Sequence, residues 1–124
     1  MLLNQSSAKR RRESVQCVNN MMTLGAAARM WANDNGDRLP PSFMAMSNEM
    51  ITPRLLLCPS DHTRPMPTRW ADGTPELTSY EIVSPGMPES DTHTVYLRCQ
   101  IHGHLGYADA TVFDGLERRG RKPR

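Results

Sequence analysis

The sequence predicts an α+β domain in which a long N-terminal amphipathic helix packs on a small antiparallel β-meander with long loops. Two patterns predict this class. From Ser14 to Asp37, apolar residues recur at helical spacing in two adjacent stripes, which together are wide enough to pack on a sheet. From Ser79 onward, short segments alternate between apolar and polar residues, as strands do when one face is buried.

The length of 124 residues allows one domain with a modest core. Because only 38% of the residues are hydrophobic and the chain has 10 Pro and 8 Gly, the core is expected to be small and the loops long. The predicted parts are a basic, partly frayed helix start (1–13), a headpiece (14–115) and a disordered basic tail (116–124). Within the headpiece, the expected order is a helix at 14–35, a loop region at 36–78 and a strand meander at 79–115.

The helix is the best-defined element of the sequence. One of its stripes consists of Val15, Val18, Met22, Ala26 and Met30, and the other of Cys17, Met21, Leu24, Ala28 and Trp31. Lys9 to Arg12 place positive charge at the helix start, where the helix dipole disfavours it, so the first turns are expected to fray. At the other end, Asn33 to Gly36 tolerate left-handed backbone, and Pro40 prevents a return to helix.

In the meander, strands are expected at 79–83, 92–99, 105–109 and 111–113. The strand at 92–99 alternates best, with Val95 and Leu97 on one face and Tyr96 on the other. A further short apolar strand is expected at Leu55 to Leu57.

Three sequence blocks resemble a known family. They are CVNNMMTLGAAARMWANDNGDRLP (17–40), PRLLLCPSD (53–61) and RCQIHGHLGYADATV (98–112). The first is similar to the segment that follows the membrane-spanning part of the N-terminal helix in pilin-like proteins, where Cys-x-Asn-Asn-Leu leads to a Gly, an aromatic residue and Asn-Asp-Asn-Gly-Asp-x-x-Pro. The second and third resemble that family's PKLLVCPSD and CPIHG...DGS elements. The chain therefore resembles the type II secretion pseudopilins and other bacterial proteins with a prepilin-type N-terminus, over most of its length.

The resemblance implies a structural protein and not an enzyme. In this family, helices pack side by side to build a secretion pseudopilus or a type IV pilus-like filament. It implies other pilin-like subunits as partners, and the stripe of Val15, Val18, Met22, Ala26 and Met30 as the packing face. It also implies a parent protein anchored in the inner membrane before assembly and located in the periplasm or at the cell surface. The chain as given shows no leader and no run of about 20 apolar residues, so we expect it to be soluble.

The three cysteines allow several states. In the exported compartment that the resemblance implies, Cys58 and Cys99 are candidates for a disulfide, with Cys17 as an alternative partner. A Cys58–Cys99 bond closes a loop of about 40 residues, worth about 3 to 4 kcal/mol in the chain-entropy model. Free buried thiols are a second possibility. A third is a zinc site formed by Cys58, His62, Cys99 and His102, because two Cys and two His can complete a tetrahedron.

No other chemistry is indicated. The sequence contains no nucleophile motif, phosphate loop or nucleotide fingerprint, so we expect neither catalysis nor a small-molecule substrate. No cofactor is expected, with zinc and calcium as minor alternatives, since Asp34, Asn35 and Asp37 match only part of a calcium loop. Nucleic acid is not expected, because no aromatic residue is interleaved with Lys9 to Arg12. The alternative function is a small zinc-stabilised binding module, engaging nucleic acid through Lys9–Arg12 and Arg118–Arg124.

Overall fold

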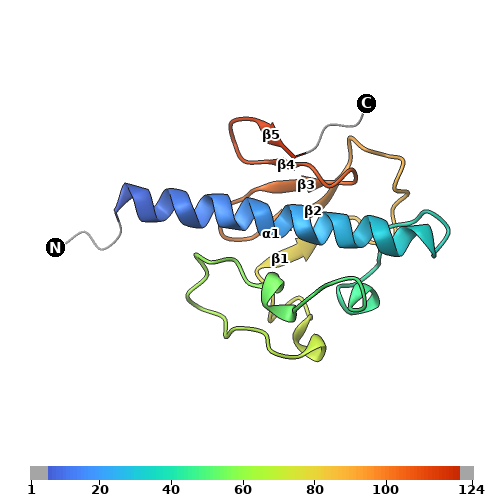
Figure 1. Cartoon of the computed structure of the whole chain (residues 1–124), viewed down its shortest axis with the longest axis horizontal. Coiled ribbons are helices and arrows are strands. Elements are labelled where there is room, and N and C mark those ends of the chain that lie inside the picture. The colour runs from blue at the N-terminus through green and yellow to red at the C-terminus, as the bar shows by residue number, and fades with distance from the viewer. Residues whose placement is uncertain (1–5, 121–124) are drawn as a thin grey trace.

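The computed structural model describes residues 6–120, and over this range it contains one α-helix and one five-stranded antiparallel sheet (Figure 1). The predicted α+β class is confirmed. The helix α1 spans Ser7–Asn33. The strands are β1 (Tyr80–Ile82), β2 (Val95–Cys99), β3 (Leu105–Tyr107), β4 (Val112–Phe113) and β5 (Arg118–Arg119), and they lie in sequence order across the sheet.

Helix α1 includes residues 7–13, the part of the predicted helix start that was expected to be partly frayed. The side chain of Ser6 accepts a hydrogen bond from the backbone N–H of Lys9 at 3.1 Å, which caps the helix despite the basic residues that follow. The helix ends at Asn33, and the N–H of Asn35 bonds back to the carbonyl of Ala32 at 3.0 Å. Gly36 then takes the left-handed conformation (φ 72°) that the sequence indicated for this stop.

One stripe of α1 supplies the helical side of the core. Cys17, Met21, Leu24 and Ala28 are at most 1% exposed, and they belong to one buried cluster that also contains residues of the strands. The helix is in contact with β2, β3 and β4 and crosses them in Figure 1. Its closest approach is at Gly25, where an added Cβ would lie 2.9 Å from the Cα of Ala110.

Strand β2 is irregular at the position where strict alternation was expected. Val95 pairs with Tyr107 and Leu97 pairs with Gly106, so Tyr96 is an extra residue in a β-bulge. Tyr96 and Leu97, which are consecutive in β2, are both 1% exposed. The Tyr96 hydroxyl donates a 2.5 Å hydrogen bond to the carbonyl of Pro40, which ties the loop after α1 to the sheet.

Two predicted features differ from the structure. The segment expected as a strand at Leu55 to Leu57 is largely a 3₁₀ turn, η2 (Pro53–Leu56), because the Thr52 side chain caps it and Pro53 is suited to a first helical position. The prediction that residues 116–124 are disordered is wrong for residues 118–119, because these form β5 and pair with β4. Residues 1–5 of the predicted helix start and 121–124 of the predicted tail lie outside the described residues.

Strand β5 is held by the contacts of Arg118. Its guanidinium lies 4.0 Å above the ring centre of Tyr107 and donates hydrogen bonds to the carbonyl of Thr92 (2.6 Å) and the carboxylate of Asp109 (3.0 Å). A charged side chain with this many partners fixes the backbone that carries it. The basic composition of the tail therefore contributes to order here.

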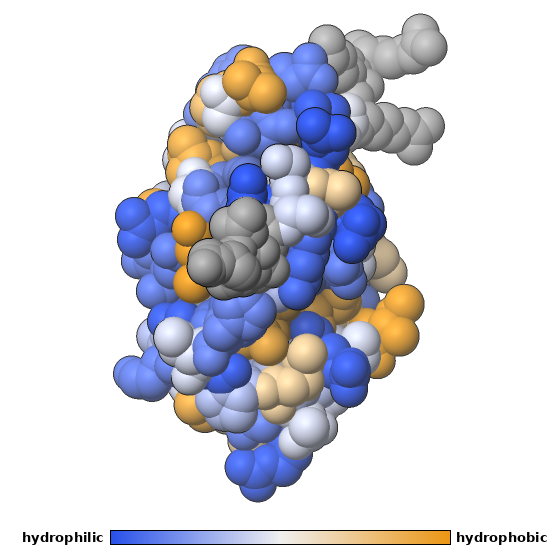
Figure 2. Space-filling view, turned by 90° about the vertical axis from the view of Figure 1, so that its left-hand side faces the viewer, coloured by the Kyte–Doolittle hydropathy of each residue, from blue (hydrophilic) through white to orange (hydrophobic). Residues whose placement is uncertain are grey.

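The face of the molecule at which α1 begins is mainly hydrophilic, with hydrophobic residues scattered among the polar ones (Figure 2). Within residues 6–120, none of the helices combines the length and the apolar content that crossing a bilayer requires.

Candidate metal centre

Three cysteines and one histidine from separate parts of the chain converge beneath α1. Cys17 lies on the buried stripe of α1, Cys58 follows η2, Cys99 ends β2, and His102 lies in the turn after β2. The three sulfurs and one imidazole nitrogen all lie within 4.8 Å of one another. Among the residues that the structure describes, no other group of three or more His, Cys, Asp or Glu side chains meets this condition.

The separations within the cluster are short. The sulfurs of Cys17 and Cys99 are 3.5 Å apart. The Nδ1 atom of His102 lies 3.3 Å from the sulfur of Cys58 and 3.8 Å from the sulfur of Cys99. All three cysteine residues are 0% exposed, whereas His102 is half-buried and forms the solvent side of the cluster.

Hydrogen-bond donors surround the sulfurs. The backbone N–H of His102 donates to the sulfur of Cys99 at 3.3 Å, and the hydroxyl of Tyr80 donates to the sulfur of Cys17 at 3.4 Å. The backbone N–H of Cys58 is itself bonded to the Ser79 hydroxyl at 2.9 Å, which fixes the backbone at this position. Donors aimed at sulfur favour the thiolate form.

The pKa values of the three thiols are shifted in different directions. Hydrogen bonds to Cys58 and Cys99, together with burial, raise the pKa of Cys17 far above its usual range. A hydrogen bond with Cys17 lowers the pKa of Cys58, but a hydrogen bond with Cys99 and burial outweigh it and raise that pKa to about 12. The pKa of Cys99 is lowered, because its sulfur accepts hydrogen bonds from Cys17 and Cys58.

A second histidine, His104, packs against the ring of His102. The rings of His102 and His104 are stacked, with centroids 4.8 Å apart and planes 6° from parallel. The Nε2 atom of His104 lies 3.2 Å from the hydroxyl of Ser14 on α1. Burial, and then the neighbouring His102, lower the pKa of His104. The stack with His104 limits the orientations open to the His102 ring.

The predicted zinc set needs one correction. Cys58, Cys99 and His102 come together as expected, but His62 is exposed and lies outside the cluster, where Cys17 takes the fourth position. Local spacing suggested His62. The turn after Cys58 instead buries Asp61, whose carboxylate accepts a 2.6 Å hydrogen bond from Ser79.

Sequence reasoning placed Cys17 in the helix core but did not assign it to the metal set. The sequence did indicate that Cys17 could join the set, because it lies on the helix stripe expected to face the sheet, and the strand that ends at Cys99 belongs to that sheet. The three cysteines are free in the structure, so the disulfide between Cys58 and Cys99, or one involving Cys17, stays a prediction. The residues that matched part of a calcium loop form the helix stop, in which the Asn35 side chain bonds to the carbonyl of Trp31 at 2.7 Å.

The predicted helix packing face divides in two. Val15 and Met30 are 55% and 57% exposed, and Ala26 is also exposed. Met22 is half-buried against the core, and Val18 is buried at 4% exposure. The exposed part of the stripe therefore runs along the outer side of α1 without Val18.

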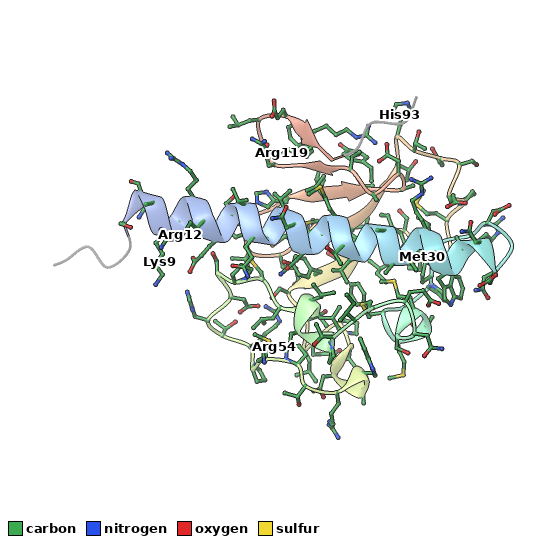
Figure 3. All side chains as sticks on the ribbon, viewed as in Figure 1. Lys9, Arg12, Met30, Arg54, His93 and Arg119 are labelled. Atoms are coloured by element: carbon green, nitrogen blue, oxygen red, sulfur yellow. The ribbon has the colours of Figure 1, made fainter. Side chains whose placement is uncertain are left out.

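The basic residues of the two chain ends also differ in their surroundings. Lys9 and Arg12 are exposed near the start of α1 (Figure 3). Arg118 and Arg119 are instead paired within the molecule, Arg118 with Asp109 and Arg119 with Asp114.

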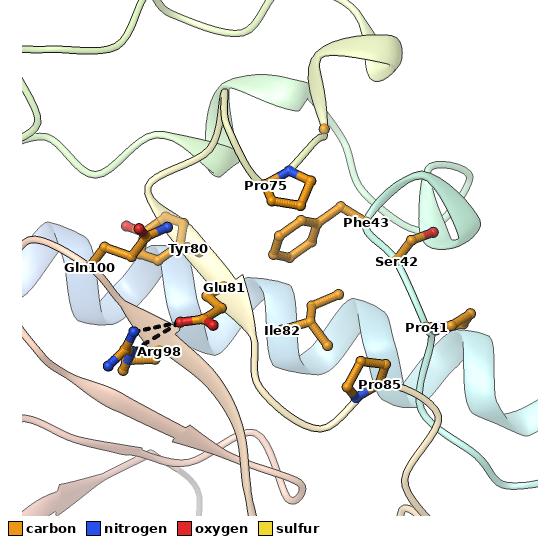
Figure 4. A pocket seen from close by; sticks show the side chains of 11 residues that line it. Pro41, Ser42, Phe43, Pro75, Tyr80, Glu81, Ile82, Pro85, Arg98 and Gln100 are labelled. Carbon is orange, nitrogen blue, oxygen red and sulfur yellow. Dashed lines mark hydrogen bonds and ion pairs between the residues drawn. The ribbon is translucent and has the colours of Figure 1, made fainter.

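A groove of about 400 Å³ lies beside the edge strand β1 (Figure 4). Pro41, Phe43, Pro75, Ile82 and Pro85 supply apolar walls. The charged groups along it, Glu81 and Arg98, are paired with each other at 2.7 Å. The groove therefore presents no free charged group for acid–base chemistry.

No protein-family model, curated protein or solved structure matches this chain.

Proposed function

We propose that the chain is the headpiece of a pilin-like structural subunit, which contributes to a bacterial secretion pseudopilus or a type IV pilus-like filament. In this role other pilin-like subunits are the partners, the parent protein is anchored in the inner membrane before assembly, and the headpiece works in the periplasm or at the cell surface. The role requires no catalytic group and no small-molecule substrate.

The observation that carries the proposal is a set of apolar residues that α1 leaves exposed outside its buried stripe. The inner face is fully used by the core, yet Val15, Ala26 and Met30 remain exposed on the outer side. Residues separated by 11 and 4 positions lie on the same side of a helix at 3.6 residues per turn. Packing against the helices of neighbouring subunits would bury these three side chains, which the core of this chain leaves exposed.

The order of elements is a second support. A 27-residue helix is followed by irregular loops and then by an antiparallel sheet whose strands follow sequence order. This is the arrangement that the three resembling sequence blocks imply for a pilin-like headpiece.

Photo-crosslinking in cells that produce the protein naturally tests this role. A benzophenone amino acid at Met30 is expected to form an adduct with a second pilin-like subunit, because this side chain is 57% exposed on α1. The matched control is the same amino acid at Ile51, which is 90% exposed but lies in the loop region. The absence of adducts from both Met30 and Ala26, at native expression level, would reject the structural role.

A second candidate is a zinc-stabilised binding module, and the cluster of three cysteines and His102 favours it. The nucleic-acid surface proposed with this module has less support, because Arg118 and Arg119 form ion pairs with carboxylates of the same chain. Binding of a labelled RNA or DNA duplex that falls steeply with salt would support this candidate, and no binding at low salt would reject its nucleic-acid part.

A further inference from the structure

We propose that Cys17, Cys58, Cys99 and His102 bind one Zn²⁺ ion in a closed, tetrahedral, structural site. The inference goes beyond the proposed structural-subunit role and does not depend on it, because it concerns how the headpiece is held together. It also differs from the zinc set expected from sequence, since Cys17 replaces His62.

The distances fit a zinc tetrahedron. Zinc lies about 2.3 Å from sulfur and about 2.0 Å from nitrogen, so in a tetrahedron two sulfurs are about 3.8 Å apart and a sulfur and a nitrogen about 3.5 Å apart. The cluster has 3.5 Å between two sulfurs, and 3.3 and 3.8 Å between sulfur and nitrogen. The remaining pairs of ligand atoms lie within 4.8 Å of each other, so side-chain shifts of up to about 1 Å would complete the site. A disulfide needs about 2.05 Å between its sulfurs, so the sulfurs of Cys17 and Cys99 would have to approach by about 1.5 Å.

The ligand types select the metal. Three thiolates and one imidazole suit Zn²⁺, whereas Ca²⁺ and Mg²⁺ take oxygen ligands, which this cluster does not offer. Four protein ligands fill all four tetrahedral positions and leave none for water or substrate. Because the cysteines are also fully buried, the site has a structural and not a catalytic character.

The surroundings can carry the charge of such a site. Three thiolates and one Zn²⁺ together leave one negative charge in a buried position. The N–H of His102 and the O–H of Tyr80 already point at two of the sulfurs and would offset that charge. The stack with His104 holds the His102 ring so that Nδ1 faces the sulfurs.

The position of the site explains why the molecule would need it. One bound ion would join α1, the segment after η2, and the end of β2, which are far apart in the sequence. Cys17 and Cys99 alone are separated by 82 residues. In a chain with a small core, such a link fixes the helix on the sheet.

Elemental analysis of the full chain, purified without chelator or reductant, tests the proposal. The expected result is one zinc per chain and three free thiols after unfolding in a chelator. Replacement of zinc by Co²⁺ is expected to give thiolate-to-cobalt charge transfer with the intensity of three thiolates and visible bands of tetrahedral cobalt. A chain that holds a disulfide, or that binds neither metal when fully reduced, would overturn the proposal.

Variants identify the ligands. Cys17→Ser and His102→Ala are each expected to weaken Co²⁺ binding by more than about 100-fold, since even loss of supporting groups around a metal costs 10- to 100-fold. His62→Ala is the matched control and should leave the metal content unchanged, because His62 is exposed outside the cluster. If Cys17→Ser does not fold, the wild-type cobalt spectrum still decides, because an intensity typical of two thiolates would show that one of the three cysteines is not a ligand and would overturn the proposed site.

Discussion

Replacing Gly25 by Ala on α1 sets two physical effects against each other. In an ordinary helix, Ala in place of Gly stabilises the fold by about 1 kcal/mol, because Gly loses more backbone entropy on folding. At this position, however, the new Cβ would lie 2.9 Å from the Cα of Ala110 and 3.0 Å from its Cβ. Neither atom can rotate away, so the helix or the turn between β3 and β4 must move.

Overpacking of this kind costs about 1 to 3 kcal/mol, and the rigid backbone contact argues for the upper half of that range. After the gain in helix propensity is subtracted, we expect Gly25→Ala to destabilise the protein by about 1 to 2 kcal/mol. With a urea m-value of about 1 to 2 kcal/mol/M, the unfolding midpoint falls by about 1 M. Urea titration followed by tryptophan fluorescence, at constant metal content and with reductant, measures this change.

The neighbouring exposed residue supplies the control. Ala26→Gly should destabilise by about 1 kcal/mol through helix propensity alone. The two substitutions exchange the same residue types in opposite directions at adjacent positions, and both are expected to lower the midpoint. A midpoint that rises for Gly25→Ala would refute the close approach of α1 to Ala110.

Three further substitutions test other parts of the fold. Ala110→Gly should stabilise by about 1 kcal/mol, because Ala110 has φ 70° and Gly adopts this conformation without strain; an unchanged thermal midpoint would contradict this. Tyr96→Phe should destabilise by about 1 to 2 kcal/mol, because it leaves the carbonyl of Pro40 without its 2.5 Å hydrogen bond, and a urea midpoint equal to wild type would rule that out. Burial raises the pKa of Asp61, but hydrogen bonds from Ser79 and other donors outweigh it and hold that pKa well below its usual range. The stability it contributes is thus fully present above about pH 4 and is lost as the pH falls, since the unfolded chain takes up the proton first. Asp61→Asn should lower the thermal midpoint at pH 7 and flatten its acid dependence, and an acid limb as steep as that of wild type would speak against this role.

The helix and its end could be predicted from sequence because their causes are local. Apolar spacing identified the buried stripe with Cys17 and Met21, and the Asn-Asp-Asn-Gly stretch marked the stop at Asn33. The basic residues alone predict fraying of the first turns, whereas the side chain of Ser6 caps the helix there. The bulge at Tyr96 was not predictable from alternation, since it depends on pairing with β3.

The candidate site was predictable only in part, and the reason is again the range of the interactions. Cys99 and His102 are close in sequence, so their spacing indicated a shared ligand set. The choice between His62 and Cys17 depended on which way the turn after Cys58 faces and on how α1 lies over the sheet. The strand at Arg118 could not be predicted for the same reason. Its hydrogen-bond partners, Asp109 and Thr92, lie in other turns of the chain, and these contacts hold part of the basic tail as a strand.

Because Cys17 and Cys99 are far apart in the sequence, the ribosome synthesises Cys17 well before Cys99. At about 5 to 20 residues per second, the ribosome needs roughly 4 to 16 s to add the 82 residues between them. During that interval Cys17, and later Cys58, are present in the growing chain before Cys99 and His102 have been added. The end of β2 and the turn after it thus complete the surroundings of a thiol that was synthesised much earlier, and slow translation would prolong the time for which the Cys17 thiol can react elsewhere.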